Sequence, residues 1–291
     1  MTAGNKLVSV DKVSAIITVC SSSTLSIAPI AESNNVIVMS AIATTPLLTN
    51  RSGNVFRISS SAVQWANKAA QASRTLNFTT AAIIYEQNDY PLGWKNSFKS
   101  AFEALGGKVV AEEAYPTGES DFRTTLIKIK QSKPEMLLII PLSPLAGSNI
   151  VKQLQETQLD AQIMGSEILS FHTFLKNSAG YSDGIYVVTY KYDTESPLFT
   201  AFLADYQKKF GRNITEDIYG ALGYDAFMLI AKASESCTNA DVECIKFYLT
   251  NILNKNTTGI SGTFYIDENH DGAREYQIRI IENGKLGSVV A

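Results

Sequence analysis

Short apolar segments alternate with amphipathic segments along most of the chain. The runs at 13–19, 36–40, 80–85 and 136–140 contain almost no polar residues. Such runs are typical of strands that are buried on both faces of a sheet. Between them, apolar residues recur at helical spacing, as in the stretch 61–76. This alternation predicts an α/β protein with parallel sheets that helices cover on both sides.

The pattern divides into two parts. Between Thr80 and Val188 the sequence predicts about four strand–helix units, enough for one doubly wound, Rossmann-like lobe. The segment before Ser60 has too few strands and needs later parts of the chain to become a domain. We therefore predict two doubly wound lobes that are joined by a hinge of three crossing strands. The predicted boundaries are 1–60 and 189–258 for lobe one, and 61–188 and 259–291 for lobe two.

The last part of the chain predicts a β-hairpin. Its strands would be 262–266 and 274–281, with a turn at 267–272 and a second tight turn at Asn283-Gly284. The 267–272 segment, DENHDG, matches the start of a calcium-binding loop. Its twelfth position is Ile278, where such a loop needs a bidentate glutamate, so we interpret the segment as a turn.

Composition excludes several functional classes. The 291 residues are 45% hydrophobic and 18% charged, which is typical of a globular protein. The net charge is −3 and no basic cluster is present, so we expect no nucleic-acid partner. The two histidines lack metal-ligand spacing, so we expect no metal. The sequence has no phosphate-binding glycine loop, no nucleophile elbow and no histidine placed as a base, and we expect neither a cofactor nor an enzyme.

The three cysteines bear on the cellular compartment. Cys237 and Cys244 stand just before an amphipathic helix, where a short disulfide would be typical of an exported protein. The alternative is two unpaired thiols in a cytosolic protein. Cys20 then has no partner in the chain. No apolar leader follows Met1, so either the protein is cytosolic or its start has been removed.

Candidate ligand-binding residues follow the ends of predicted strands, where open α/β sheets bind their ligands. In lobe one these are the serine cluster from Ser21 to Ser23 and the loop that contains Thr44. Hydroxyls and free N–H groups at a helix start bind anions such as carboxylates, although each cluster could equally be an ordinary helix cap. In lobe two they are Tyr90 and Glu167. A glutamate there would pair with an ammonium group, unless it is a solvated loop residue.

The ordered set of segments resembles the periplasmic binding protein type I family. The resemblance is closest to the branched-chain amino-acid (leucine/isoleucine/valine) binding proteins of ABC importers, and it spans essentially the whole chain. The segments that carry it include DKVSAIITVCSSSTLSIAPIAESNNVIVMSAIATTPLLT, AAIIYEQNDYPLGW, PEMLLIIPLS, IMGSEIL, YGALGYDAFMLIAKA and GISGTFYIDENHDGAREYQIRII.

The resemblance implies a role for individual residues. The ligand carboxylate would be bound by Ser21, with Ser22 and Ser23 adjacent, and by the step Ile42, Ala43 and Thr44. Glu167 would hold the ligand ammonium group and Tyr90 would lie beside it. Ser143 occupies a position that is often aromatic in the family, which leaves the side-chain specificity open, and Tyr219 would line the rim.

The implied function is that of an extracytoplasmic solute-binding protein. It would capture an amino acid, a branched-chain one first of all, between two lobes and deliver it to an ABC-transporter permease. It would be periplasmic or extracellular, either soluble or lipid-anchored. The alternative is the ligand-sensing ectodomain of a receptor or regulator that binds an amino acid, an amide or a urea-like compound.

The resemblance also concerns the start of the chain. Family members begin with two further βα units and a signal peptide, so we expect lobe one to lack its N-terminal part. The absent segment would hold the family partner of Cys20. The first lobe would then have an unpaired sheet edge, through which the protein could self-associate.

Overall fold

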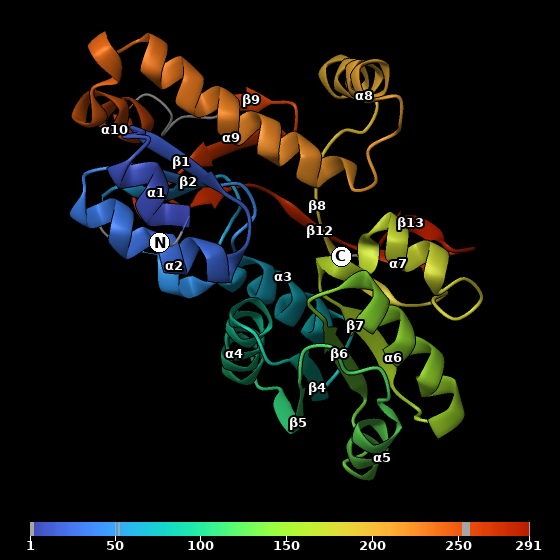
Figure 1. Cartoon of the computed structure of the whole chain (residues 1–291). Helices are drawn as coiled ribbons and strands as arrows, with labels where there is room; N and C mark the ends of the chain where they lie inside the picture. Colours follow the sequence, from blue (N-terminus) through green and yellow to red (C-terminus); the bar gives the residue numbers. More distant parts are fainter. Residues whose placement is uncertain (1–2, 50, 52, 252–256, 291) are drawn as a thin grey trace. The chain divides into compact units, whose positions relative to one another are not determined.

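The computed structural model describes residues 3–49, 51, 53–251 and 257–290. The chain divides into two compact units (Figure 1). Unit 1 comprises Met1–Ser61 and Lys191–Arg274, and unit 2 comprises Ala62–Tyr190 and Glu275–Ala291. The chain therefore passes between the units three times. The first two crossings lie close to the predicted boundaries, and the third does not.

The third crossing follows Arg274, so residues 259–274 belong to unit 1 rather than to lobe two as predicted. Strand β10 (Gly262–Ile266) pairs with β9 (Thr257–Gly259) and with β11 (Gly272–Ala273). The prediction that residues 274–281 form the second strand of this hairpin was therefore wrong. Strand β12 (Tyr276–Glu282) pairs instead with β8 (Tyr186–Tyr190) in unit 2. The reason is that the turn before β11 is bound to β3 (Val55–Arg57), where the N–H of Arg57 donates to the His270 carbonyl.

Unit 1 is built on a three-stranded parallel sheet with the order β1-β2-β3, in which β1 is Ala15–Thr18 and β2 is Ile37–Ser40. Among the described residues β1 has β2 as its only strand neighbour, and its Ile17 side chain is 39% exposed. The helical segments of the unit are α1 (Ala3–Ser9), α2 (Ser21–Ser33), η1 (Pro46–Leu48), α8 (Pro197–Phe210), α9 (Asp217–Glu235), η3 (Thr238–Ala240) and α10 (Val242–Asn251). Helix α9 packs on β1 and β2.

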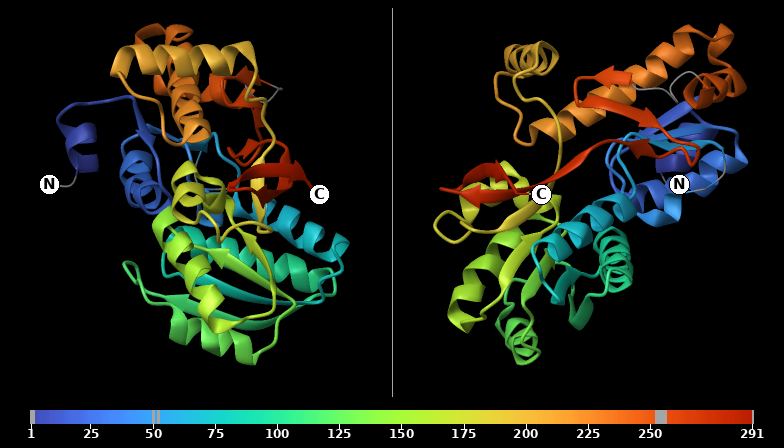
Figure 2. Two further views of the ribbon diagram at one scale, coloured as in Figure 1. Left: turned by 90° about the vertical axis from the view of Figure 1, so that its right-hand side faces the viewer. Right: turned by 180° about the vertical axis from the view of Figure 1, so that it is seen from behind.

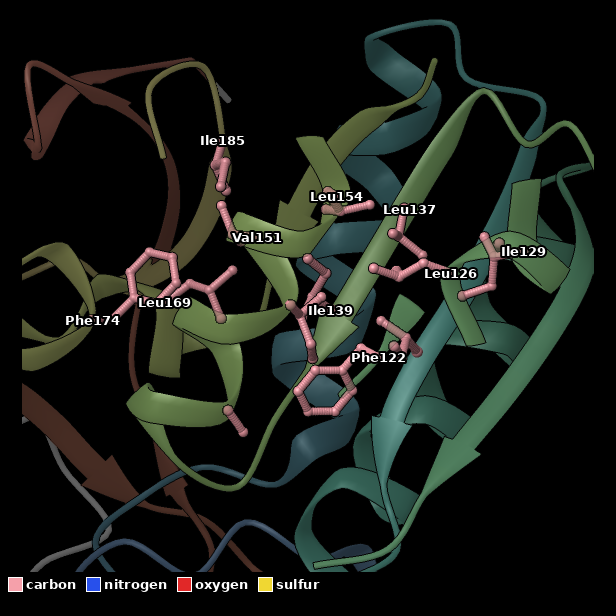
Figure 3. Close-up of a cluster of buried hydrophobic side chains, with 14 of the residues drawn as sticks. Phe122, Leu126, Ile129, Leu137, Ile139, Val151, Leu154, Leu169, Phe174 and Ile185 are labelled. Carbon is pink, nitrogen blue, oxygen red and sulfur yellow. The ribbon is translucent and has the colours of Figure 1, made fainter. Parts of the chain in front are cut away.

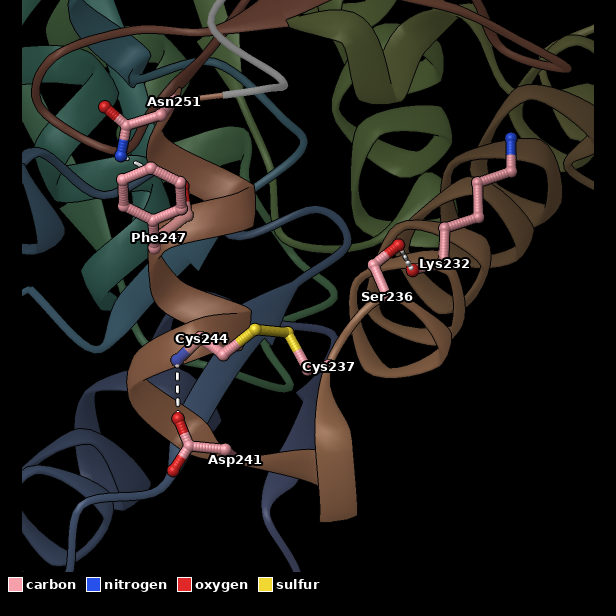
Figure 4. Close-up of a disulfide and its surroundings, with 7 residues drawn as sticks. All are labelled: Lys232, Ser236, Cys237, Asp241, Cys244, Phe247 and Asn251. Carbon is pink, nitrogen blue, oxygen red and sulfur yellow. Dashed lines mark hydrogen bonds between the residues drawn. A yellow bond between two sulfur atoms is a disulfide. The ribbon is translucent and has the colours of Figure 1, made fainter.

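The predicted disulfide joins Cys237 to Cys244 (Figure 4). It links the segment after α9 to α10. The Asp241 carboxylate accepts a hydrogen bond from the Cys244 N–H at 2.8 Å and supports the same corner. Cys20, directly before α2, is a free and exposed thiol.

Unit 2 is built on a seven-stranded sheet with the order β13-β12-β8-β7-β6-β4-β5. Strands β4 to β8 are parallel, β12 is antiparallel to β8, and β13 is antiparallel to β12. Positive φ angles of 53° at Asn283 and 67° at Gly284 form the predicted tight turn between β12 and β13. The strands not yet given are β4 (Thr80–Glu86), β5 (Lys108–Tyr115), β6 (Met136–Ile140), β7 (Gln162–Gly165) and β13 (Lys285–Val289).

Helices cover both faces of this sheet (Figures 1 and 2). One face carries α3 (Ala62–Thr75) and α4 (Asp89–Ala104), and the other carries α5 (Arg123–Gln131), α6 (Pro144–Thr157), η2 (Glu167–Ser170) and α7 (His172–Asn177). Ile139 points into a hydrophobic cluster on the second face, and Ile84 is a member of the same cluster (Figure 3). Neighbouring residues of the same strands, such as Ile83, are also fully buried. The predicted doubly wound α/β class is confirmed.

Candidate functional site

The parallel pairing of β1 and β2 brings the two predicted clusters of unit 1 together. Ser21 begins α2 directly after β1, and Thr44 lies in the loop after β2. The Ser21 hydroxyl oxygen accepts hydrogen bonds from the backbone N–H groups of Thr44 and Thr45, both at 3.3 Å. All three residues are buried. We call this group the unit 1 half-site.

The unit 1 half-site contains an unsatisfied donor. The Thr44 hydroxyl is buried and makes no hydrogen bond within the described residues. A buried hydroxyl without a partner is destabilising by about 1–3 kcal/mol. The half-site therefore combines the Ser21 hydroxyl, which accepts two long backbone hydrogen bonds, with the unpaired Thr44 hydroxyl, and each hydroxyl has a proton that it can donate to an anionic oxygen.

The other residues predicted in unit 1 have different surroundings. The exposed Ser23 side chain caps its own helix, because its hydroxyl donates to the Cys20 carbonyl at 2.9 Å and accepts from the Cys20 N–H at 3.3 Å. Ser22 and Ile42 are half-buried. Tyr219 lies in the first turn of α9 and is half-buried. Ligand contacts of these residues remain predictions.

A buried ion pair holds the loop of the unit 1 half-site. Arg57 binds both carboxylate oxygens of Asp271, at 2.6 and 2.7 Å, and both side chains are almost fully buried. The same guanidinium donates to the carbonyl of Ala43 at 3.3 Å and to that of Thr45 at 2.8 Å. Sequence reasoning missed this pair. Its only local signal is that an arginine ends an otherwise apolar strand.

In unit 2 the structure brings Tyr90 and Glu167 together. Glu167 begins η2 directly after β7, and Tyr90 lies in the first turn of α4. This helix begins at Asp89, and Pro91 fits its first turn. The indole nitrogen of Trp94, one turn after Tyr90, donates to a Glu167 carboxylate oxygen at 3.2 Å. We call Tyr90, Trp94 and Glu167 the unit 2 half-site.

Burial dominates the electrostatics of the unit 2 half-site. It raises the pKa of Glu167 to about 7, although hydrogen bonding from its neighbours acts in the opposite direction. Burial and the nearby charge of Glu167 raise the pKa of Tyr90 well above its usual value. Within the described part of the chain, no lysine or arginine pairs with Glu167. The half-site therefore holds a buried carboxyl group with no cationic partner.

A second buried carboxylate lies at the point where strand order reverses, between β4 and β6. Glu86 ends β4 and accepts a hydrogen bond from the Leu142 N–H, after β6, at 3.1 Å. Ligands of open α/β sheets bind at such a point. Ser143, which follows, accepts a hydrogen bond from the Ala146 N–H and so caps α6. Its predicted ligand contact remains a prediction.

The described residues contain neither a candidate metal site nor a candidate membrane-spanning helix. Among the described residues, no group of three or more histidine, cysteine or acidic side chains is arranged to hold a metal ion. None of the helices in the same ranges is long and apolar enough to cross a membrane.

Comparison with known proteins agrees with this architecture. The periplasmic binding protein family matches residues 1–285. The chain belongs to the periplasmic binding protein family. A relative from Pseudomonas aeruginosa, the leucine-, isoleucine-, valine-, threonine-, and alanine-binding protein, is 26% identical over 231 residues. This match covers 77% of the chain but only 60% of the relative.

Solved structures of the family superpose on the chain. A leucine binding protein from Thermotoga maritima has a TM-score of 0.87 at 26% identity, and the match covers 99% of this chain and 83% of that one. A solute binding protein from R. palustris in complex with benzoate has a TM-score of 0.84 at 19% identity, covering 99% and 81%. The predicted periplasmic-binding-protein type I fold is thereby confirmed.

Proposed function

We propose that this chain is an extracytoplasmic solute-binding protein that captures an amino acid, a branched-chain one first of all. The observation that carries the proposal is the opposite chemistry of the two half-sites. Unit 1 presents the Ser21 hydroxyl, which accepts two long hydrogen bonds from backbone N–H groups, and the Thr44 hydroxyl, which has no hydrogen-bond partner among the described residues. Unit 2 presents the buried Glu167 carboxyl group, which no lysine or arginine of the described residues pairs with. An α-amino acid carries one group for each.

The proposed mechanism is ligand-stabilised closure. The ligand carboxylate would accept hydrogen bonds from the unit 1 half-site, and its ammonium group would pair with Glu167. Only a conformation that makes both sets of contacts gains both interactions, so the ligand favours it over any other arrangement. Binding and release require no chemical reaction. The same proposal includes delivery of the ligand to an ABC-transporter permease, because the R. palustris solute binding protein is named as part of an ABC transporter. The protein would act in the periplasm or outside the cell.

Glu167 favours an amino acid over a simple aromatic acid. An aromatic carboxylate such as benzoate could use the donors around Ser21 and Thr44. It has no ammonium group, so it would leave the buried Glu167 carboxyl group without a cationic partner. The ligand of one fold neighbour therefore serves as an informative negative control.

A thermal-shift screen tests the proposed function. Leucine, isoleucine and valine should raise the melting temperature, because a ligand that binds only the folded state stabilises it by mass action. The matching amines, which lack the carboxylate, and benzoate should have much smaller effects at equal concentration. A screen in which no amino acid shifts the melting temperature would contradict the proposal.

A further inference from the structure

The orientation of one peptide group determines which way the unit 1 half-site faces. The bond between Ala43 and Thr44 is trans, as are all the described peptide bonds. Its carbonyl oxygen accepts hydrogen bonds from Arg57 at 3.3 Å and from the Ser59 hydroxyl at 2.8 Å. In a planar trans peptide the N–H points opposite to the carbonyl. Holding the Ala43 carbonyl on the Arg57 side therefore directs the Thr44 N–H toward Ser21.

All three nitrogen atoms of the Arg57 guanidinium group donate hydrogen bonds within this cluster. Besides Asp271 and the two loop carbonyls, it donates to the Thr49 hydroxyl at 2.7 Å, and that hydroxyl donates to Asp271 at 2.8 Å. Removing one partner of a buried charge pair leaves the other charge uncompensated, which is strongly unfavourable. The loop from Ala43 to Thr49 is thus held from one side by a neutral, hydrogen-bonded cluster.

Asp271 is itself fixed by its turn. The carboxylate of Asp267 accepts from the N–H groups of Asn269 and Asp271, both at 2.9 Å. The ring of His270 stacks on Phe56 of β3 with centroids 4.1 Å apart. The turn that resembled a calcium loop therefore presents Asp271 to Arg57, shortly before the chain crosses to unit 2 after Arg274.

We propose that Arg57 and Asp271 are positioning residues for recognition of the ligand carboxylate. They touch no ligand atom. They set the direction of the Thr44 N–H by holding the carbonyl of the same peptide. This inference rests on the proposed function, because it assigns a carboxylate to the unit 1 half-site. It predicts that a change at Asp271 alters selectivity for carboxylate-bearing ligands as well as folding stability.

The test compares leucine with leucinamide, in which an uncharged amide replaces the carboxylate. For Asp271→Asn, calorimetric titration should show leucine affinity reduced about tenfold or more, and leucinamide affinity reduced less than about threefold, since only a charged oxygen gains a charge-assisted bond. Glu32→Gln is the matched control: it breaks the more exposed Arg51–Glu32 pair of the same unit and should leave both affinities unchanged. Equal losses for the two ligands with Asp271→Asn would overturn the proposal.

A ligand-independent readout separates this proposal from the proposed function. Amide hydrogen exchange of Thr44 and Thr45 should become about tenfold faster in Asp271→Asn, with Val38 in β2 unchanged, because local opening costs less free energy. If the wild-type protein binds no amino acid but this exchange pattern appears, the proposed function is wrong, while the role of Asp271 in holding the Thr44 amide is supported. A folded Asp271→Asn with wild-type exchange would contradict the positioning.

A milder variant covers the case in which Asp271→Asn does not fold. Thr49→Val removes only the hydroxyl that links Arg57 to Asp271. It should give the same selective loss for leucine and the same local exchange, each to a smaller extent. Wild-type values of both quantities in this variant, together with an unfolded Asp271→Asn, would assign the pair to folding alone and overturn the proposal.

Discussion

The indole N–H of Trp94 points at the carboxylate of Glu167 and donates a hydrogen bond of 3.2 Å in a fully buried setting. This contact orients the carboxylate without neutralising it, because the indole carries no charge. The two side chains come from α4 and from the segment after β7, so the orientation depends on the packing of unit 2 as a whole. A cationic group of a ligand would complete the arrangement.

Replacing Glu167 should weaken amino-acid binding strongly. We expect Glu167→Gln to lower affinity by about 2 kcal/mol or more, about thirtyfold, because the ligand ammonium would be buried without a counter-charge. Calorimetric titration with leucine measures this loss. Glu103→Gln on the exposed side of α4 is the control and should bind as wild type does. An unchanged affinity in Glu167→Gln would remove this residue from the site.

Ligand affinity should depend on pH in the range where Glu167 titrates. Burial raises its pKa to about 7, and pairing with an ammonium group requires the ionised form. Below that pKa, affinity should fall about tenfold per pH unit, while above it affinity should level off. The ligand α-carboxyl and α-ammonium groups keep their charges between about pH 5 and 7. In Glu167→Gln the profile should be flat over that interval, and a wild-type profile that is equally flat would contradict the assignment.

The same residue should make the unliganded protein less stable as pH rises. The folded pKa of Glu167 lies above its usual value, so the folded state holds a proton that the unfolded state has released. Stability from this group is present below about pH 4.5 and is lost as pH rises through about 7. Glu167→Gln should therefore be more stable than wild type at pH 8, by up to on the order of 3 kcal/mol. Denaturant unfolding at pH 5 and pH 8 measures it; a difference that shrinks with pH would refute the shift.

Cys20 offers a chemical probe of the unit 1 half-site. Its thiol is free and exposed, and it directly precedes Ser21, whereas the other two cysteines form a disulfide. A saturating amino acid should slow alkylation of Cys20 at least about threefold, because a bound ligand beside the helix start restricts access. Mass spectrometry follows the modification. Benzylamine, which lacks a carboxylate, is the matched control ligand and should give no protection.

Much of the fold could be predicted because strands buried on both faces leave apolar runs in the sequence, as β4 and β6 do. Parallel pairing of β1 and β2 then explains why Ser21 and Thr44 meet. The pairing of β10 could not be predicted. Both β11 and β12 follow it closely, and the choice depends on distant contacts of Arg57, whose N–H donates to the His270 carbonyl and whose side chain pairs with Asp271. Trp94 had a local signal, its position one helical turn after Tyr90, but its partner Glu167 comes from another element.

A hydrogen-bond donor supplied by the main chain does not require a particular side chain at its position. The Thr44 N–H would be present with almost any side chain at that position, and proline alone removes it. Substitutions at Thr44 other than proline would therefore keep this N–H donor and change only the side-chain hydroxyl beside it. Other side chains that contact a ligand could meanwhile diverge toward new ligands. One fold could in this way keep binding the carboxylate that its ligands share, while its specificity for the rest of the ligand changes during evolution.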